Sequence, residues 1–253
     1  MLFSEQSHPR SIEDLARETG LPHSTIYRYI KTLSDVGLIV AVSAGCYVLG
    51  PSIILLDRQM RLSDPLLNSA EQVKTRLAAE LPSPGMVLVC RLFRNSVMCV
   101  DSAGSGRLGF IVSYSRGRAL PLHRGAASKV ILAHLPLRNV KALFEADAAP
   151  FASAGLGEDW RTVRTSLRKI RQQGFSISHG ELDQGALGFG SPVLAPDGQI
   201  LGSLAYVTQE DATDERAAEQ IRTAIQAGAK EIEANLATFL HVEGDVSEEH
   251  GRG

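Results

Sequence analysis

The stretch SIEDLARETGLPHSTIYRYIKTLSDVGLI, residues 11–39, predicts two helices joined by a tight turn. Ser11 offers a capping hydroxyl just ahead of two acids, and apolar residues recur at helical spacing until Gly20-Leu21-Pro22 interrupts the helix. A second helix begins near His23, and Gly37 is free to adopt the positive φ that ends many helices. Three apolar residues give this second helix an inward face: Ile26, Ile30 and Leu33.

A hairpin follows the two helices. The β-type runs 38–42 and 46–49 are separated by Ser43-Ala44-Gly45, which favours a turn. Helix, turn, helix and hairpin together predict a winged helix-turn-helix over residues 1–50. The outer face of the second helix carries hydroxyl, aromatic and basic side chains, which suit contacts to phosphates and base edges. We predict that six residues contact DNA: Ser24, Thr25, Tyr27, Arg28, Lys31 and Thr32.

The charge balance bears on how such a module binds. The whole chain of 253 residues has a net charge of −2, which excludes a polycation and makes any nucleic-acid surface local. Residues 1–62 contain six basic and six acidic residues. A single module is therefore expected to bind DNA weakly, and pairing two modules in a dimer is the usual remedy. The alternative is a solvated helix of an unrelated α-helical domain.

Composition and cysteine usage predict a cytoplasmic protein. The chain is 44% hydrophobic and 21% charged, as in ordinary globular domains. Its three cysteines have no CxxC spacing, so neither a disulfide framework nor a cysteine-built zinc site is expected. The first ten residues lack the pattern of a secretory signal, and no apolar run reaches the roughly 18–20 residues of a membrane helix. We therefore expect a reduced environment and no membrane contact.

Beyond the hairpin, the sequence predicts a linker over residues 51–81 and a mixed α/β domain over 82–242, so the fold class is α+β. Linker helices are expected at 53–60 and 66–81, and Pro82-Ser83-Pro84-Gly85 marks the boundary. In the domain, strands are expected at 86–92, 97–102, 108–113, 175–179, 189–194 and 200–208. Helices are expected at 126–135, 137–146, 160–173 and 213–240. The polar, acidic tail 243–253 is expected to be disordered.

Several motifs in this order resemble the IclR family of bacterial transcriptional regulators. They are the stretch quoted above, YVLG at 47–50, RALPLHRGAASKVILAHLP at 118–136 and IRQQGFSISHGELDQGALGFGSPVLAPDGQILGSLAYV at 170–207. The resemblance covers residues 11–240. It implies a winged helix-turn-helix joined by a linker helix to a GAF-like effector-binding domain, in a homodimer or homotetramer that binds double-stranded operator DNA. The family also has a full helix ahead of Ser11, where this sequence offers only residues 1–10, so that helix is shortened or the natural start lies upstream.

The resemblance also assigns positions in the effector pocket. They fall on Ala126, Ala127, Ser178, Gly188, Ala205 and Val207. Relatives that hold small carboxylates commonly have Ser-x-Ser where this chain has Ala205-Tyr206-Val207, so hydroxyl donors are missing while volume and apolar surface are gained. We therefore expect an effector larger or more apolar than a two-carbon acid, such as an aromatic or acyl compound. The alternative is that other backbone or side-chain donors hold a small carboxylate.

The stretch 102–144 contains seven basic residues and no acid. A positive field beside the pocket would favour an anionic effector, with Arg118 and Arg124 as the candidate contacts. The alternative is a solvated basic face, or one that pairs with acids elsewhere in an oligomer. A further stripe of arginines, at 161, 164, 168 and 171, is interpreted as the solvent-facing side of a helix whose other side is apolar.

No motif predicts catalysis. GSGRLG at 104–109 matches GxGxxG, but a strand is expected after it, and the seven histidines show no metal-ligand spacing. No catalytic residue, metal or cofactor is therefore assigned. The expected function is a ligand-responsive transcriptional regulator that binds operator DNA and a small, anionic and partly apolar metabolite. A small-molecule sensor without specific DNA binding is the main alternative, and an enzyme with an accessory N-terminal domain is another.

Overall fold

The computed structural model describes residues 2–3, 9–43, 45–105, 108 and 112–250. The chain divides into two compact units, Met1–Asp64 and Pro65–Gly253. Each unit has its own cluster of buried apolar side chains. The two helices that the sequence places in one linker fall one in each unit.

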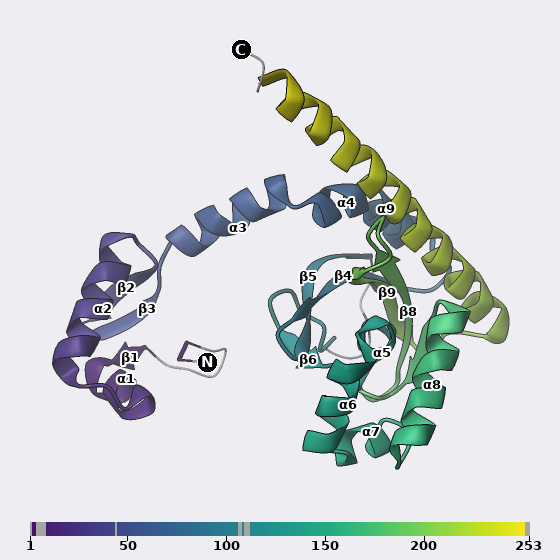
Figure 1. Ribbon diagram of the computed structural model, residues 1–253, viewed down its shortest axis with the longest axis horizontal. Helices are drawn as coiled ribbons and strands as arrows, with labels where there is room; N and C mark the ends of the chain where they lie inside the picture. Colours follow the sequence, from purple (N-terminus) through teal and green to yellow (C-terminus); the bar gives the residue numbers. More distant parts are fainter. Residues whose placement is uncertain (1, 4–8, 44, 106–107, 109–111, 251–253) are drawn as a thin grey trace. The chain divides into compact units, whose positions relative to one another are not determined.

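The N-terminal unit is a helix-turn-helix followed by a small sheet (Figure 1). Its elements are β1 (Arg10–Ser11), α1 (Ile12–Thr19), α2 (His23–Asp35), β2 (Ile39–Ser43), β3 (Cys46–Leu49) and α3 (Ser52–Ser63). The strands pair antiparallel in the order β1-β3-β2, so the predicted hairpin is confirmed and has a short third strand beside it. Its core consists of Ile12, Leu15, Ala16, Ile26, Ile30 and Ile39.

Local signals explain where the first two helices begin and end. The Ser11 hydroxyl accepts the backbone N–H of Asp14 at 3.0 Å, and the Asp14 carboxylate accepts the backbone N–H of Ser11 at 3.3 Å, a reciprocal cap. Gly20 and Gly37, each with φ of 70°, adopt the left-handed conformation just beyond α1 and α2. The inward orientation predicted for Leu33 is wrong: this side chain is 37% exposed and lies outside the buried cluster, which takes only two residues of α2.

The C-terminal unit is built on a six-stranded antiparallel sheet of order β6-β5-β4-β9-β8-β7. Its elements are α4 (Pro65–Glu80), β4 (Gly85–Phe93), β5 (Ser96–Ser105), β6 (Ala119–Pro121), α5 (Ala126–His134), α6 (Leu137–Ala146), α7 (Ala149–Ser153), α8 (Trp160–Gln173), β7 (Ser176–His179), β8 (Ala186–Leu194), β9 (Ile200–Gln209) and α9 (Glu215–His250).

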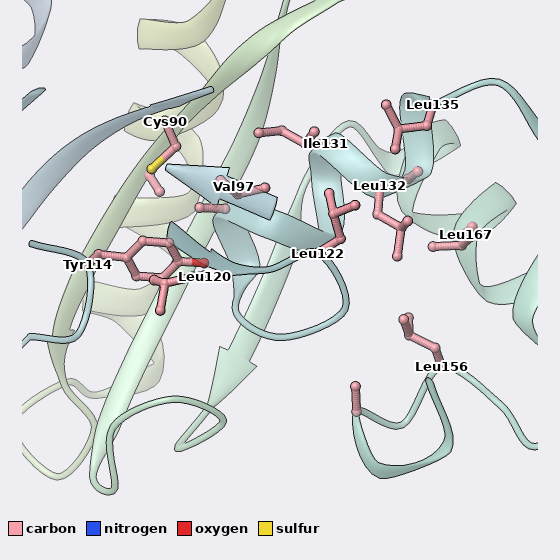
Figure 2. Packing of buried hydrophobic residues seen from close by; sticks show 14 of the residues in the cluster. Cys90, Val97, Tyr114, Leu120, Leu122, Ile131, Leu132, Leu135, Leu156 and Leu167 are labelled. Atoms are coloured by element: carbon pink, nitrogen blue, oxygen red, sulfur yellow. The ribbon is translucent and has the colours of Figure 1, made fainter. Parts of the chain in front are cut away.

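Alternating side chains on the central strands form two cores, one on each face of this sheet. On β9, Leu204 and Tyr206 belong to the cluster that packs against α4 and α9, while Ala205 and Val207 belong to the cluster that packs against α5 and α8. The second cluster includes Tyr114, drawn near Leu120 in Figure 2, and Leu132 of α5 and Leu167 of α8, which are drawn farther from it. The α5 side of the sheet therefore combines a packed core with the family's pocket positions.

The structure differs from the sequence-based prediction in three places of this unit. Of the strand predicted at 108–113, residues 109–111 lie outside the described residues and the flanking ones are not in a strand; β6 pairs with β5 instead, with Leu120 opposite Val97. The short α7 was not predicted. In the structure, α9 continues to His250, through the segment 243–250 for which the sequence predicts disorder; this segment is rich in glutamate, a good helix former.

Candidate functional site

The face of α2 that is predicted to contact DNA lies opposite the core of the N-terminal unit. Ser24, Tyr27, Arg28, Lys31 and Thr32 are exposed, whereas Thr25 is half-buried. Ile26 and Ile30 are 4% and 6% exposed, so they hold the helix against the core and leave the polar face outward. The structure therefore places five of the six residues on one accessible helix surface.

The basic groups of this surface are available to a ligand. No ion pair involves Arg28 or Lys31 within the described part of the chain. The Arg28 guanidinium lies 5.9 Å from the centroid of the Tyr29 ring, within the range of a cation–π contact. The Thr32 hydroxyl donates to the Arg28 carbonyl oxygen at 3.0 Å, and its oxygen keeps lone pairs free to accept a hydrogen bond.

The six predicted effector positions come together at one pocket of the C-terminal unit. Ser178, Gly188 and Val207 are successive partners across β7, β8 and β9, and Ala205 lies two residues along β9 on the same face. The first turn of α5 lies over this floor and supplies the remaining two positions, Ala126 and Ala127. A Cβ atom at position 188 would lie 2.5 Å from the Ser178 hydroxyl oxygen, so a larger residue here would displace that hydroxyl from its hydrogen bond to Ala126.

An internal carboxylate binds the N-terminus of α5 at the pocket wall. Glu181 accepts the backbone N–H of Gly125 at 2.9 Å through one oxygen and the Lys129 ammonium at 2.5 Å through the other. The Ser178 hydroxyl accepts the N–H of Ala126 at 3.1 Å. Lys129 is nearly buried, with its side chain 8% exposed, and it also donates to the Ala154 carbonyl at 2.9 Å. Two of the amides at the start of α5, which attract anions, are thus already satisfied by the protein.

The pocket is small in this structure. Its free volume is about 20 Å³, enough for about one water molecule. Tyr114 and Leu182 line it and pack directly over Gly125, where a Cβ atom would meet the Tyr114 hydroxyl at 2.6 Å and Leu182 at 2.8 Å. Tyr114 is held by a hydrogen bond of 2.9 Å to the Ser128 hydroxyl, and burial raises the pKa of its phenol, which stays neutral. The volume expected from the small residues of the floor is therefore taken up by these two side chains.

The two arginines predicted near the pocket have different positions. The Arg124 guanidinium donates to the Glu181 carbonyl oxygen, which places it at the rim. Arg118 is exposed and does not line the pocket; its backbone N–H donates to the Ser115 carbonyl at 3.0 Å. Part of the basic stretch 102–144 is neutralised within the chain, because Lys129 pairs with Glu181 and Lys141 pairs with Glu145.

Sequence reasoning missed the polar and bulky part of the pocket wall. Glu181, Asp183, Tyr114 and Leu182 were not among the candidates, although Glu181 lies only three residues beyond Ser178. One signal in the sequence could have pointed to Glu181. The basic stretch 102–144 contains no acid and needs counter-ions from elsewhere, and two acids, at 181 and 183, lie within five residues of the pocket position Ser178.

Among the described residues, no helix has both the length and the apolar character needed to cross a membrane. Likewise, no group of three or more His, Cys, Asp or Glu residues gathers closely enough to hold a metal ion in the described ranges.

Comparisons with known proteins agree with this architecture. Residues 2–43 match the model of the IclR helix-turn-helix domain, and residues 65–234 match that of the bacterial transcriptional regulator IclR C-terminal domain. The HTH-type transcriptional regulator XynR of Escherichia coli is 26% identical over 228 residues, covering 89% of this chain and 88% of that protein. KipR of Bacillus subtilis, another HTH-type regulator, is 21% identical, with 77% of each chain covered.

Solved structures share the fold over nearly the whole chain. An IclR transcriptional regulator from Silicibacter sp. TM1040 has a TM-score of 0.77 at 21% identity, covering 92% of this chain and 91% of that one. An IclR homologue from Microbacterium hydrocarbonoxydans, solved in complex with 4-hydroxybenzoate, has a TM-score of 0.75 at 20% identity, with 94% and 95% covered. The regulators of this group are not enzymes. The chain belongs to the IclR family of bacterial transcriptional regulators.

Proposed function

We propose that this regulator binds operator DNA through the exposed face of α2 and binds a small, partly apolar organic anion in the pocket between α5 and strands β7, β8 and β9. The observation that carries the effector part is the convergence of all six predicted positions on one pocket, although they come from four separate elements. The alanine and valine floor of the pocket suits an apolar body, and the Arg124 guanidinium beside Glu181 offers a positive charge for an anion.

Because the pocket is small, an effector can enter it only by displacing side chains of the pocket wall. An aromatic or acyl compound does not fit into about 20 Å³, so Tyr114 and Leu182 must move aside as it enters. The 4-hydroxybenzoate bound by the Microbacterium homologue is an aromatic carboxylate, which is the class of compound that we infer for this chain. Effector and DNA binding would then be linked reciprocally, with a coupling of about 1–3 kcal/mol.

The surface of α3 supports the proposal of a dimer. Six large apolar side chains of this helix are exposed, and Ile54, the most exposed of them, is 74% accessible. The six are Ile53, Ile54, Leu55, Leu56, Met60 and Leu62. Exposed apolar side chains gathered on one helix are typical of an interface, and two modules bind a two-fold operator more tightly than one. Sedimentation analysis of the full chain distinguishes the homodimer from the homotetramer, and Ile54→Glu with Leu55→Glu is expected to give a smaller species.

DNA binding is tested by fluorescence anisotropy with the fragment just upstream of the chain's own coding region. Scrambled DNA at the same physiological salt is the control, because the phosphate contribution depends on salt. A specificity ratio above about 10³ supports the regulator. An absence of preference, repeated with a chain begun further upstream, would favour a small-molecule sensor that does not bind specific DNA.

Arg28→Ala sharpens that experiment. If Arg28 makes a bidentate contact to guanine, the loss of operator affinity is about 1–3 kcal/mol, while affinity for scrambled DNA changes much less. Arg17→Ala is a suitable control, since Arg17 is an exposed arginine of α1 that pairs with Asp14. Equal affinities of the Arg28→Ala variant and the unchanged chain for the operator would remove Arg28 from the base-reading set.

The effector pocket is tested by calorimetric titration with 4-hydroxybenzoate and related aromatic carboxylates. Val207→Phe fills the floor of the pocket and is expected to abolish binding, whereas Tyr206→Phe, on the opposite face of the same strand, is expected to leave it unchanged. Ser178→Thr, which adds one methyl group to the wall, is the milder second variant if Val207→Phe melts at a lower temperature. Binding that survives both pocket variants would place the effector elsewhere.

A further inference from the structure

A second and larger cavity lies at the other end of α5. Its volume is about 660 Å³, within the range of about 300–1,000 Å³ found for ligand pockets. It is bounded by the last turn of α5, the start of α6, the outer face of α8 and the turn before β9. It shares no lining residue with the effector pocket described above. We call this cavity the α8 groove.

Three arginines of α8 line one wall of the α8 groove. Arg164, Arg168 and Arg171 follow one another at spacings of four and three residues, so their side chains lie on one face of the helix. No ion pair or side-chain hydrogen bond holds any of the three within the described part of the chain, and α8 itself contains no acid. By contrast, Arg222 on α9 pairs with Glu219, and Arg76 on α4 pairs with Glu231.

The rest of the lining is mostly apolar, with Asn139 and Gln199 among it. Leucines from four elements line the groove, and two of them, Leu92 and Leu137, are 40% and 47% exposed. His134, at the end of α5, donates through Nδ1 to the Val130 carbonyl at 2.7 Å. Burial, together with the nearby Arg171 guanidinium, holds the pKa of this histidine below its ordinary value, so its Nε2 is an uncharged acceptor at neutral pH.

We propose that the α8 groove is a second ligand site, which takes a small organic anion with an apolar body. Guanidinium groups without internal partners donate paired hydrogen bonds to a carboxylate, sulfonate or phosphate. The exposed leucines are then covered by the apolar part of the same molecule. This site is independent of the proposed effector pocket and adds to the proposed function.

The test uses 8-anilinonaphthalene-1-sulfonate as the probe and the full chain as the protein. Its fluorescence rises in an apolar site, and its sulfonate provides the anion. Saturable binding of one probe per chain is expected. The triple variant Arg164→Gln, Arg168→Gln, Arg171→Gln is expected to weaken this binding by at least about tenfold. The matched control is Arg161→Gln with Lys169→Gln, which removes two charges from the same helix outside the groove and is expected to have little effect.

Two comparisons assign the result to this site. N-phenyl-1-naphthylamine has the same rings without the sulfonate, so its affinity is expected to be equal in the triple variant and the unchanged chain. Val207→Phe blocks the effector pocket and is expected to leave the sulfonate probe bound. The proposal is overturned if the unchanged chain does not bind the probe, if the triple variant binds it with unchanged affinity, or if Val207→Phe alone abolishes binding.

Discussion

The two ends of α5 differ in how the chain treats its positive charges. At the N-terminal end, Glu181 accepts hydrogen bonds from Lys129 and the Gly125 amide, Ser178 accepts the Ala126 amide, and bulky side chains leave space for about one water. At the C-terminal end, three arginines of α8 face a cavity of about 660 Å³ without internal ion pairs among the described residues. A cation that is paired and buried contributes to the fold, whereas one left unpaired at a cavity costs little to keep and is free for a ligand.

The largest expected effect concerns the paired end. Lys129→Met removes the ammonium and leaves the Glu181 carboxylate, whose side chain is 19% exposed, without its cation. The loss of stability is expected to be about 3 kcal/mol, measured as the denaturation of the C-terminal unit within the full chain. Lys141→Met is the matched control: its pair with Glu145 is exposed, and about 0.5 kcal/mol or less is expected.

A double variant completes that measurement. Adding Glu181→Gln to Lys129→Met removes the uncompensated charge and is expected to restore part of the lost stability. If the two substitutions instead give simply additive losses, Lys129 acts through packing, and the contrast between the two ends of α5 is not electrostatic.

A smaller effect is expected from the hydroxyl of Tyr114. Tyr114→Phe removes its hydrogen bond to Ser128 in a buried site and is expected to cost about 1 kcal/mol. Because the ring remains, the pocket keeps its small volume, and affinity for an aromatic carboxylate is expected to change by less than the stability does. Thermal denaturation and titration of the same preparation give both numbers, and a large gain in affinity would indicate that this hydrogen bond keeps the pocket closed.

The triple substitution of Arg164, Arg168 and Arg171 by glutamine is expected to change stability by about 0.5 kcal/mol or less, since these exposed side chains have no ion pair to lose among the described residues. Denaturant unfolding of the triple variant and of the unchanged chain measures the difference. A loss approaching that of Lys129→Met would mean that both ends of α5 use their cations structurally.

The smallest expected effect is a pH dependence of the folding stability, caused by His134 at the α8 groove. The folded-state pKa of His134 lies below its ordinary value, because burial disfavours the charged ring. As the pH falls, the unfolded chain therefore protonates this histidine before the folded chain does. The contribution of the neutral His134 to the free energy of unfolding is fully present above about pH 6.5 and is lost as the pH falls toward the lowered pKa. His134→Gln is expected to flatten the melting temperature between pH 7 and pH 5. His123, whose pKa burial also lowers, contributes in the same direction and remains in the variant.

Much of the fold could be predicted because it depends on local signals. Ser11 caps the start of α1, and Gly37 adopts its left-handed conformation just beyond the end of α2. The hydrophobic spacing of α8 predicts that helix, and the breaker at 82–85 predicts the boundary before β4. Each of these signals acts within a few residues. The strand predicted at 108–113 and the short β6 show the opposite case. A strand at the edge of a sheet is chosen by its partner rather than by its own sequence, and here β5 pairs with Ala119–Pro121.

The site was predictable only where a known motif reaches it. All six pocket positions came from the resemblance, whereas Arg118, chosen from charge alone, lies away from the pocket. The Glu181–Lys129 pair joins residues 52 positions apart, and no periodicity reveals such a contact. The α8 groove was missed for the same reason: the arginine stripe is visible in the sequence, but the cavity that it faces is made by segments far apart along the chain.

The alternation along β9 has a consequence for how this protein changes over generations. Leu204 and Tyr206 serve the helices on one face, while Ala205 and Val207 form the floor of the pocket on the other. A substitution at 205 or 207 reshapes what the pocket admits without disturbing the packing of α4 and α9. Alternate residues of this one strand thus determine the packing of the domain and the specificity of its pocket separately. A lineage can therefore acquire a new effector while its scaffold stays the same.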